Sequence, residues 1–355
     1  MPSDAAAVSR MPAAEVRATI ADVALKAGVS KATVSRFLNN RDKLLSREIA
    51  TRVETAIGAL GYSPSPMAQA LKRGRSRLIG LVVADIANPF SVAVLRGAEK
   101  ACQEAGYLVM LFNLGNASER EREGIEALAS YQVEGFILNT LGGDPAAAGE
   151  MARHGKPAVL VDRKHATMHA DFVSLNNADA VQRAVSHLLD NGWQELLFVT
   201  EPVAGVSSRA EREAAFRAVV SQPGMGVAGQ SLEIADGSDD ALDQALRDLG
   251  RRAGSRPPAV VSSNALVTLR VAAAVARLGW QFGHDIGFVG FDDTDWAPLI
   301  GPGLTTIAQP TDDLGRIAVS CLLERLQGRS LPPREILLTG RLVVRGSSQP
   351  RDAAT

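Results

Sequence analysis

Two sets of side chains in this sequence have the types and spacing needed to bind a partner molecule. The first lies near the N-terminus, where basic, hydroxyl and amide side chains alternate with apolar ones. Lys31 and Arg36 can donate hydrogen bonds to guanine acceptors in the major groove of DNA, and Ala32 offers an apolar contact to a thymine methyl group. The other candidates for DNA contacts, which suit phosphates better than bases, are Thr19, Ser30, Thr33, Ser35 and Asn39.

Two short helices joined by a tight turn would position these side chains. Thr19 and Asp22 have the spacing of a capping box, with Asp in place of the usual Glu, so a helix is expected to begin there. Gly28 suits the positive φ of a turn. Ser30 can cap a second helix through the amide of Thr33. These features predict a helix-turn-helix, in which the second helix enters the major groove.

A third helix is expected from Ser46 to a cap at Gly61, with apolar residues at helical spacing. Charge separates this N-terminal unit from the rest of the chain. Residues 1–77 hold 13 Lys and Arg against 6 Asp and Glu, a net charge of +7, whereas the remainder carries −8. This asymmetry indicates an anionic partner for the N-terminal end only. The alternative is a helical hairpin whose basic face is merely solvated.

A short basic segment follows, with the features of a conditional helix. Ser65 and Pro66 form an N-cap and first-turn pair, and about two helical turns follow. A helix of this length is marginal alone in water, so it should fold only when it pairs with a second copy or lies on DNA. Leu71 is then a candidate wedge between base steps of the minor groove, with Lys72 on a phosphate. A plain basic linker is the alternative.

From residue 78 onward, short apolar strands alternate with helical stretches. The pattern predicts an α/β domain of two lobes, each a parallel sheet with helices on both faces, behind an all-α headpiece. The predicted strands are Leu78–Val83, Leu108–Phe112, Gly135–Asn139, Ala158–Val161, Leu196–Thr200, Ala259–Ser262 and Ile286–Gly290, and the predicted helices include Phe90–Glu104, Ala178–Asn191, Ser208–Ser221 and Leu266–Leu278. In such sheets ligands collect at the carboxyl ends of the strands, which here border the crevice between the lobes.

The second set of candidate binding residues follows these strands. Asp162 and Asp292 can accept paired hydroxyl bonds, Arg163 can donate as a fork, and the ring of Trp296 can cover the apolar face of a sugar. A polyhydroxylated ligand would need these side-chain types. The cations in the same loops would offset a ligand carboxylate, and they are Arg163, Lys164, His165, Arg209 and Arg212. The alternative is that such aspartates cap helices and that the basic loop is solvated.

Several strings resemble the lactose/galactose repressor (LacI/GalR) family of transcriptional regulators. They are Gly28-Val-Ser-Lys-Ala-Thr-Val-Ser-Arg36, Gly61-Tyr-Ser-Pro, Ala68-Gln-Ala-Leu71, Asn88-Pro-Phe, Val289-Gly-Phe-Asp-Asp293 and Leu304-Thr-Thr-Ile-Ala-Gln-Pro310. The resemblance extends from residue 19 to about residue 346. It implies a sensor domain similar to periplasmic sugar-binding proteins, and a homodimer that places Leu71 of paired hinge helices at the centre of a pseudo-palindromic operator in double-stranded DNA. The ligand positions that it implies are Phe90, Ser91, Asp162, Ser208, Arg212, Asn264 and Asp292.

Within the family, the strings Asp162-Arg-Lys-His, Asp171-Phe-Val-Ser-Leu and Asp292-Asp-Thr-Asp-Trp look like the sugar-acid regulators, nearest to those that answer to 2-ketogluconate. The implied function is a repressor whose operator affinity falls when a sugar acid binds as inducer. A neutral sugar or a purine, as inducer or corepressor, remains the alternative. Two positions depart from the family. Ala265 stands where Asp is common, which puts the capping of the following helix in question, and Ala215 stands where Gly is common.

Other function classes find little support. Cys102 and Cys321 have no disulfide or zinc-ligand pattern. The sequence contains neither a P-loop nor a dinucleotide-binding glycine motif, so we expect no enzyme, no cofactor and no metal. A solute-binding protein would need an export signal, which is not apparent, and a membrane span is not predicted. We therefore expect a cytoplasmic dimer with a disordered tail at 1–17, a headpiece at 18–62, a hinge at 63–77, a sensor at 78–347 and a tail at 348–355.

Overall fold

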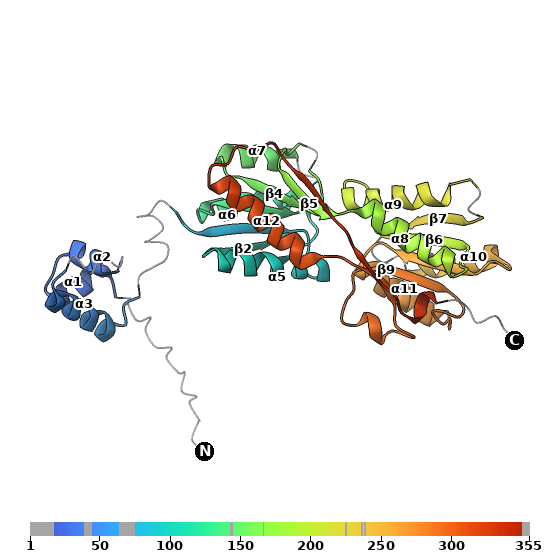
Figure 1. The fold of residues 1–355 in the computed structure, drawn as a ribbon, viewed down its shortest axis with the longest axis horizontal. Helices are drawn as coiled ribbons and strands as arrows, with labels where there is room; N and C mark the ends of the chain where they lie inside the picture. The colour runs from blue at the N-terminus through green and yellow to red at the C-terminus, as the bar shows by residue number, and fades with distance from the viewer. Residues whose placement is uncertain are drawn as a thin grey trace, which may run out of the picture. The chain divides into compact units, whose positions relative to one another are not determined.

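The computed structural model describes residues 18–38, 45–63, 75–142, 145–165, 167–223, 226–235, 237 and 239–349. The chain divides between Ser76 and Arg77 into two compact units, the headpiece and the sensor, each described here by itself (Figure 1). The headpiece contains α1 (Ile20–Ala27), α2 (Lys31–Leu38) and α3 (Arg47–Leu60). The domain bounds expected from the sequence stay predictions, because several of them lie within or beside residues outside the described ranges.

Local signals explain where the headpiece helices begin and end. Thr19 and Asp22 form the expected capping box, in which the amide of Thr19 donates to Asp22 Oδ2 over 2.8 Å. Gly28 ends α1 with a φ of 64°, which a side chain would strain. The helices enclose a small core, and its buried members are Val23, Ala24, Ala27, Val34, Val53 and Ala56. The predicted three-helix unit is therefore present.

The N-terminal lobe of the sensor, called the N-lobe below, is built on an entirely parallel sheet with the strand order β11-β5-β4-β3-β1-β2. Its strands are β1 (Leu78–Val83), β2 (Leu108–Asn113), β3 (Gly135–Asn139), β4 (Ala158–Val161), β5 (Asp171–Leu175) and β11 (Glu335–Leu338). Its helices are α5 (Pro89–Glu104), α6 (Glu121–Ser130), α7 (Pro145–His154) and α12 (Thr311–Leu326), with the 3₁₀ turn η2 (Ser118–Arg120) before α6.

Both faces of this sheet are buried, as the apolar run of β1 predicts. Ile79 and Leu81 belong to the core cluster that includes α5 and α12, whereas Val82 belongs to the cluster on the opposite face with α6 and α7. Successive strand residues point to opposite faces, so a strand covered on both sides must be apolar throughout. α5 and α12 lie against each other so closely that a Cβ on Gly97 would collide with the backbone of Asp312.

The second lobe, called the C-lobe below, repeats the design with the order β12-β10-β9-β8-β6-β7. Its strands are β6 (Glu195–Thr200), β7 (Ala228–Glu233), β8 (Pro258–Ser262), β9 (Gly287–Phe291), β10 (Thr305–Ala308) and β12 (Arg341–Val343). Its helices are α8 (Asn177–Asp190), α9 (Ser207–Val220), α10 (Asp239–Ala253) and α11 (Ala265–Arg277), with the 3₁₀ turns η3 (Ala297–Leu299) and η4 (Gly346–Ser348). Only β12 pairs antiparallel to its neighbour among the described strands.

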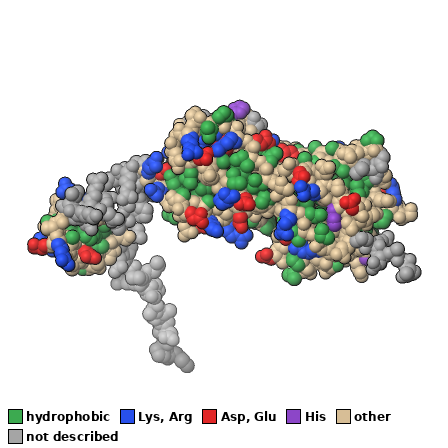
Figure 2. All heavy atoms as spheres, in the orientation of Figure 1, with side chains coloured by type: hydrophobic (Ala, Val, Ile, Leu, Met, Phe, Trp, Pro, Cys, Tyr) green, Lys and Arg blue, Asp and Glu red, His purple; other side chains and the backbone are tan. Residues whose placement is uncertain are grey.

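The chain passes between the lobes three times: from β5 to α8, from β10 to α12, and from β11 to β12. The last passage is the long red segment that joins the lobes in Figure 1. Because every parallel strand ends toward the other lobe, the residues after the strands meet in one interlobe region, as expected. Basic and acidic side chains are mixed over the visible face of the sensor (Figure 2).

The predicted α/β fold is confirmed, and each of the seven predicted strands and four predicted sensor helices is present within one residue at either end. Most of the additional strands are short or partly exposed, whereas β5 is buried throughout. β7 reads Ala-Gly-Gln-Ser-Leu-Glu and lies at a sheet edge, so it lacks an apolar run. β10 has only four residues, of which two are threonines.

Candidate DNA-binding surface and effector cleft

The helix α2 presents the predicted DNA-contacting side chains on one face. Ser30 caps the helix, with its Oγ accepting from the amide of Thr33 over 3.1 Å. Val34 is fully buried and anchors the opposite face in the headpiece core. The side chains of Lys31, Ala32 and Arg36 are exposed, whereas Thr33 and Ser35 are partly exposed. This helix can therefore offer two cations and a methyl group to a groove.

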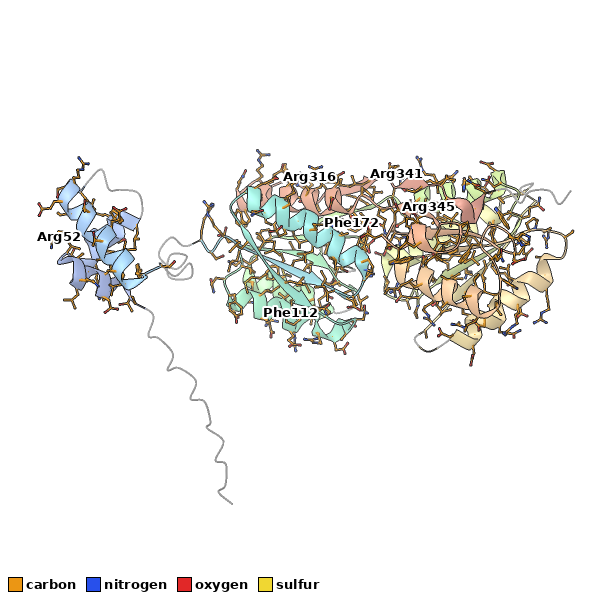
Figure 3. The ribbon with its side chains drawn as sticks, turned by 90° about the horizontal axis from the view of Figure 1, so that it is seen from below. Arg52, Phe112, Phe172, Arg316, Arg341 and Arg345 are labelled. Carbon is orange, nitrogen blue, oxygen red and sulfur yellow. The ribbon has the colours of Figure 1, made fainter. Side chains whose placement is uncertain are left out.

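The other predicted DNA contacts have different positions. Thr19 is exposed, but its hydroxyl is engaged with Asp22 in the capping box. Asn39, Leu71 and Lys72 lie outside the described residues, so the minor-groove role of the hinge stays a prediction. Arg52 on α3 was not among the residues predicted from the sequence. Its Nη2 donates to the carbonyl of Ala27 over 2.6 Å, and this bond holds the turn between α1 and α2 in place (Figure 3).

Two aspartates, one in each lobe of the sensor, follow the ends of parallel strands and face the region between the lobes. Asp162 follows β4, and its amide continues the ladder by donating to Val173 O over 2.9 Å. Asp292 follows β9 and donates in the same way to Ile307 O over 3.0 Å. Both have a positive φ, 66° and 72°, a conformation that is uncommon outside glycine and is often retained at functional positions. Both side chains are buried.

Arg212 on α9 is the centre of the cleft. Its Nε donates to Asn177 Oδ1 over 2.8 Å and its Nη1 to Ser263 O over 2.6 Å. Its Nη2 donates to Gln309 Oε1 over 3.4 Å and lies 3.8 Å from Asp162 Oδ1. The guanidinium also stacks over the ring of Phe291, 4.4 Å from its centroid. Burial lowers the pKa of Arg212, which nevertheless stays cationic at neutral pH.

Contacts between the lobes surround this arginine. Ser208 Oγ in the C-lobe donates to Asp162 Oδ2 in the N-lobe over 3.2 Å. The amide of Lys164 donates to Ser207 Oγ over 2.8 Å. The first turn of α9 therefore touches the loop after β4. A ligand that binds at either element can change the separation of the lobes.

The basic side chains of the loop after β4 differ in exposure and in their partners. Arg163 is almost fully buried, with Nη1 donating to Thr140 O over 3.4 Å. Lys164 is about half exposed and pairs with Glu335 over 2.9 Å and with Glu211 over 3.4 Å, so its charge is compensated outside the cleft. His165 is buried, and its Nδ1 lies 3.3 Å from the amide and hydroxyl of Thr167.

Asp292 is held by groups from two elements. Its Oδ1 accepts from Gln309 Nε2 over 2.7 Å, and its Oδ2 accepts from the amide of Ala265 over 3.0 Å. Burial raises the pKa of Asp292, against the opposing effects of Arg212 and these donors. Asn264 caps α11 by accepting from the amide of Val267 over 2.9 Å. The concern about capping beside Ala265 was therefore wrong, because Asn264 and Asp292 together satisfy the helix start.

The predicted ligand positions form two neighbouring groups and two supporting residues. Asp162, Arg163, Ser208 and Arg212 are linked directly. Phe90, Asp292 and Trp296 line a cavity of about 350 Å³ that Gln309 also borders. Ser91 and Asn264 are buried and engaged, Ser91 with Asn139 Oδ1 over 3.4 Å and Asn264 with both Glu201 and its own helix. Whether each residue contacts a ligand stays a prediction.

Gln309 and Asn177 were not predicted, although both accept hydrogen bonds from Arg212. Gln309 follows β10 in the same way that Asp292 follows β9, so recognising that short strand would have found it. Asn177 begins α8 and could be found only from the long-range packing.

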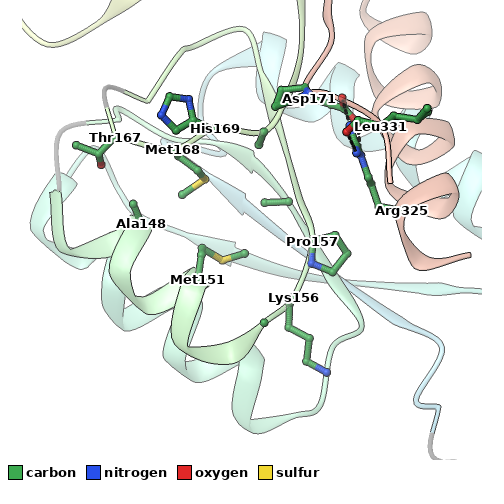
Figure 4. A pocket seen from close by; sticks show the side chains of 14 residues that line it. Ala148, Met151, Lys156, Pro157, Thr167, Met168, His169, Asp171, Arg325 and Leu331 are labelled. Carbon is green, nitrogen blue, oxygen red and sulfur yellow. Dashed lines mark hydrogen bonds and ion pairs between the residues drawn. The ribbon is translucent and has the colours of Figure 1, made fainter. Parts of the chain in front are cut away.

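A larger cavity, of about 480 Å³, lies in the N-lobe at the amino ends of β4 and β5, opposite the cleft (Figure 4). Met151, Met168 and Pro157 form part of its wall. Its buried carboxylate belongs to Asp171, which already pairs with Arg325 Nη2 over 2.8 Å and with Arg334 Nη2 over 3.0 Å. Burial alone would raise the pKa of Asp171, but these arginines outweigh it and lower that pKa. The carboxylate of Asp171 is therefore already satisfied by residues of the fold.

None of the helices in the described ranges has the length and apolar character of a membrane span. No cluster of three or more His, Cys, Asp or Glu side chains suited to a metal ion occurs among the residues the structure describes.

Comparison with known proteins identifies the family. Residues 19–65 match the model of bacterial regulatory proteins of the lacI family, and residues 185–348 match that of a periplasmic binding protein-like domain. The HTH-type transcriptional regulator PtxS of Pseudomonas plecoglossicida is 46% identical over 96% of this chain and 98% of its own length. The HTH-type transcriptional regulator KdgR of Bacillus subtilis is 39% identical over 93% and 97%. The crystal structure of the lac repressor dimer bound to operator and the anti-inducer ONPF is 27% identical, with a TM-score of 0.79 over 94% of this chain and 100% of that one. The chain is a DNA-binding transcriptional regulator, not an enzyme, and it belongs to the lacI family of bacterial regulatory proteins.

Proposed function

We propose that this regulator is a dimeric cytoplasmic repressor that binds a pseudo-palindromic operator. It leaves the operator when a sugar acid such as 2-ketogluconate binds in the interlobe cleft. The lac repressor was solved as a dimer on operator DNA, and its structure covers nearly the whole of this chain. A two-fold dimer matches a two-fold operator.

The observation that carries the sugar-acid proposal is the charge of the cleft. Arg163 and Arg212 are both buried there, and burial lowers the pKa of each without neutralising it. A buried cation is costly unless an anion pairs with it, so a carboxylate ligand gains more from this site than a neutral sugar does.

The rest of the cleft suits a polyhydroxylated body. Asp162 Oδ1 and Ser263 Oγ are buried and make no hydrogen bond within the described chain, so both can serve ligand hydroxyls. The rings of Phe90 and Trp296 line the adjoining cavity and can cover an apolar sugar face.

The proposed mechanism is linkage between lobe separation and the hinge. Lys31 and Arg36 would read bases, and Leu71 would enter the minor groove only while paired hinge helices are folded. A ligand that joins the first turn of α9 to the loop after β4 changes the separation of the lobes, and this change biases hinge folding.

A thermal-denaturation series on the full chain tests the effector class, with 2-ketogluconate, gluconate, fructose, glucose and hypoxanthine as ligands. A ligand at 100 times its dissociation constant should stabilise the sensor by about 2.7 kcal/mol. We expect the sugar acids to raise the melting temperature. The sugar-acid proposal fails if only neutral sugars or the purine do so.

A further inference from the structure

Two arginines, one from each lobe, each have a buried Nε donor without an acceptor among the described residues. The side chain of Arg163 in the N-lobe is 9% exposed. Its Nη1 is directed to Thr140 O, and its Nε lies 3.4 Å from Asp162 Oδ2 without forming a hydrogen bond. That Nε is buried and has no hydrogen-bond acceptor among the described residues. Buried donors of this kind are rare in folded proteins, and each calls for a physical explanation.

Arg209 on α9 in the C-lobe has the same arrangement. Its Nη1 donates to Pro202 O over 3.0 Å, and its Nη2 pairs with Glu201 Oε2 over 2.7 Å. Glu201 is itself fixed by Asn264 Nδ2 over 2.6 Å. The Nε of Arg209 is buried and likewise lacks an acceptor in the part of the chain that the structure describes. Both guanidinium groups are thus held by their terminal nitrogens and leave the Nε donor free.

The two arginines flank a contact between the lobes: Arg163 follows Asp162, and Arg209 follows Ser208, whose Oγ donates to Asp162 Oδ2 over 3.2 Å. Burial is the main cause that lowers the pKa of Arg163, and the positive charges of Arg209 and Arg212 lower that pKa further, while Asp162 and Glu201 oppose them. Two like charges that are partly desolvated repel each other, and an anion between them converts the repulsion into two attractions.

We propose that Arg163 and Arg209 form a clamp for the carboxylate of the effector, with each Nε–H donating to one of its two oxygens. A carboxylate supplies two acceptors in one plane, which suits two donors from opposite sides. The hydroxylated part of the ligand then lies toward Asp162 Oδ1 and Ser263 Oγ, beside Arg212. The clamp rests on the proposed sugar-acid function and adds Arg209 as the residue that selects acids over neutral sugars.

The clamp also gives the carboxylate a part in regulation. Its two arginines belong to different lobes, so a bound carboxylate links the loop after β4 to α9 by two charge-assisted hydrogen bonds. A neutral sugar of the same shape can occupy the cleft without forming this link. Acid and neutral ligands should therefore differ in their effect on lobe separation as well as in affinity.

Isothermal titration calorimetry on the full chain tests the clamp with 2-ketogluconate and fructose, which differ by a carboxylate in place of a hydroxymethyl group. We expect Arg163→Gln and Arg209→Gln each to weaken 2-ketogluconate binding at least tenfold and to leave fructose binding within about twofold. Arg209→Lys, which keeps the charge but loses the Nε–H, should cause an intermediate loss. Arg217→Gln is the matched control, because Arg217 lies on the same helix but is exposed and pairs with Glu213.

The outcomes separate the clamp from the proposed function. If wild-type protein prefers 2-ketogluconate and Arg209→Gln either leaves its affinity unchanged or weakens both ligands equally, the clamp is wrong and the sugar-acid function stands. If wild-type protein prefers fructose or binds neither ligand, the sugar-acid assignment fails and the clamp fails with it. Melting temperatures of all variants show whether each is folded, and the Arg209 variants decide the result should Arg163→Gln not fold.

Discussion

Replacing Arg212 with lysine keeps the positive charge of the cleft but removes the geometry that holds it. Arg212 donates to Asn177 Oδ1, Ser263 O and Gln309 Oε1, at 2.8, 2.6 and 3.4 Å. A lysine ammonium on the same backbone cannot reproduce this fork, and at most one of the two short bonds would survive.

A hydrogen bond to a charged group contributes about 1.5–3 kcal/mol, and a buried acceptor left without a partner adds a further cost, so Arg212→Lys should destabilise the sensor by roughly 2–4 kcal/mol. For domains of this size each 1 kcal/mol changes the melting temperature by about 2–4 °C, so a decrease of roughly 5–15 °C is expected.

Differential scanning calorimetry measures this decrease directly, with Arg217→Lys as control. Arg217 is exposed and pairs with Glu213 on the surface of the same helix, an interaction that contributes about 0–1 kcal/mol. The reasoning is refuted if Arg212→Lys melts within about 2 °C of wild type, because the contacts of Arg212 would then contribute nothing to the stability of the sensor.

Three further outcomes follow from the same account. Lys31→Ala and Arg36→Ala should each weaken operator binding by about 1–3 kcal/mol in fluorescence anisotropy, while Lys26→Ala on α1 should change it less; equal losses would contradict the assignment of α2 as the reading helix. Leu71→Ala should weaken operator binding and leave effector affinity unchanged in calorimetry, and parallel loss of both would contradict the separate role of the hinge. His187 is bonded to Ser348 Oγ over 2.8 Å, and burial lowers its pKa from 6.5 against the opposing effect of Asp190. Because the unfolded chain then binds a proton that the folded chain does not, stability should fall as the pH drops below about 6.5, and His187→Gln should reduce this fall in thermal melts at pH 7.5 and 5.5; an equal fall in both proteins would exclude His187 as its source.

The sequence predicted best those features that depend on local patterns. The capping box at Thr19, the turn at Gly28 and the aspartates that end β4 and β9 all follow from residues close together in the chain. The fold class followed from apolar strands that alternate with helices, because strands buried on both faces must be apolar throughout.

Contacts between residues far apart in the chain could not be predicted from the sequence. Nothing near Arg212 in the sequence indicates that Asn177 and Ser263 accept hydrogen bonds from it, and Gln309 was missed because β10 is short and rich in threonine. The sequence grouped five loop cations together, whereas the structure directs Lys164 to Glu335 and Glu211, outside the cleft. Which of these cations face the cleft depends on how the two lobes pack, and no local sequence pattern predicts that packing.

The central claim is that a sugar acid releases this repressor from its operator. The most direct measurement is fluorescence anisotropy of the full chain on an operator fragment identified by selection from random DNA, titrated at constant salt with 2-ketogluconate or fructose. We expect 2-ketogluconate to lower operator affinity at least tenfold and fructose at the same concentration to leave it unchanged. Operator affinity that is unchanged or increased by 2-ketogluconate would contradict the central claim.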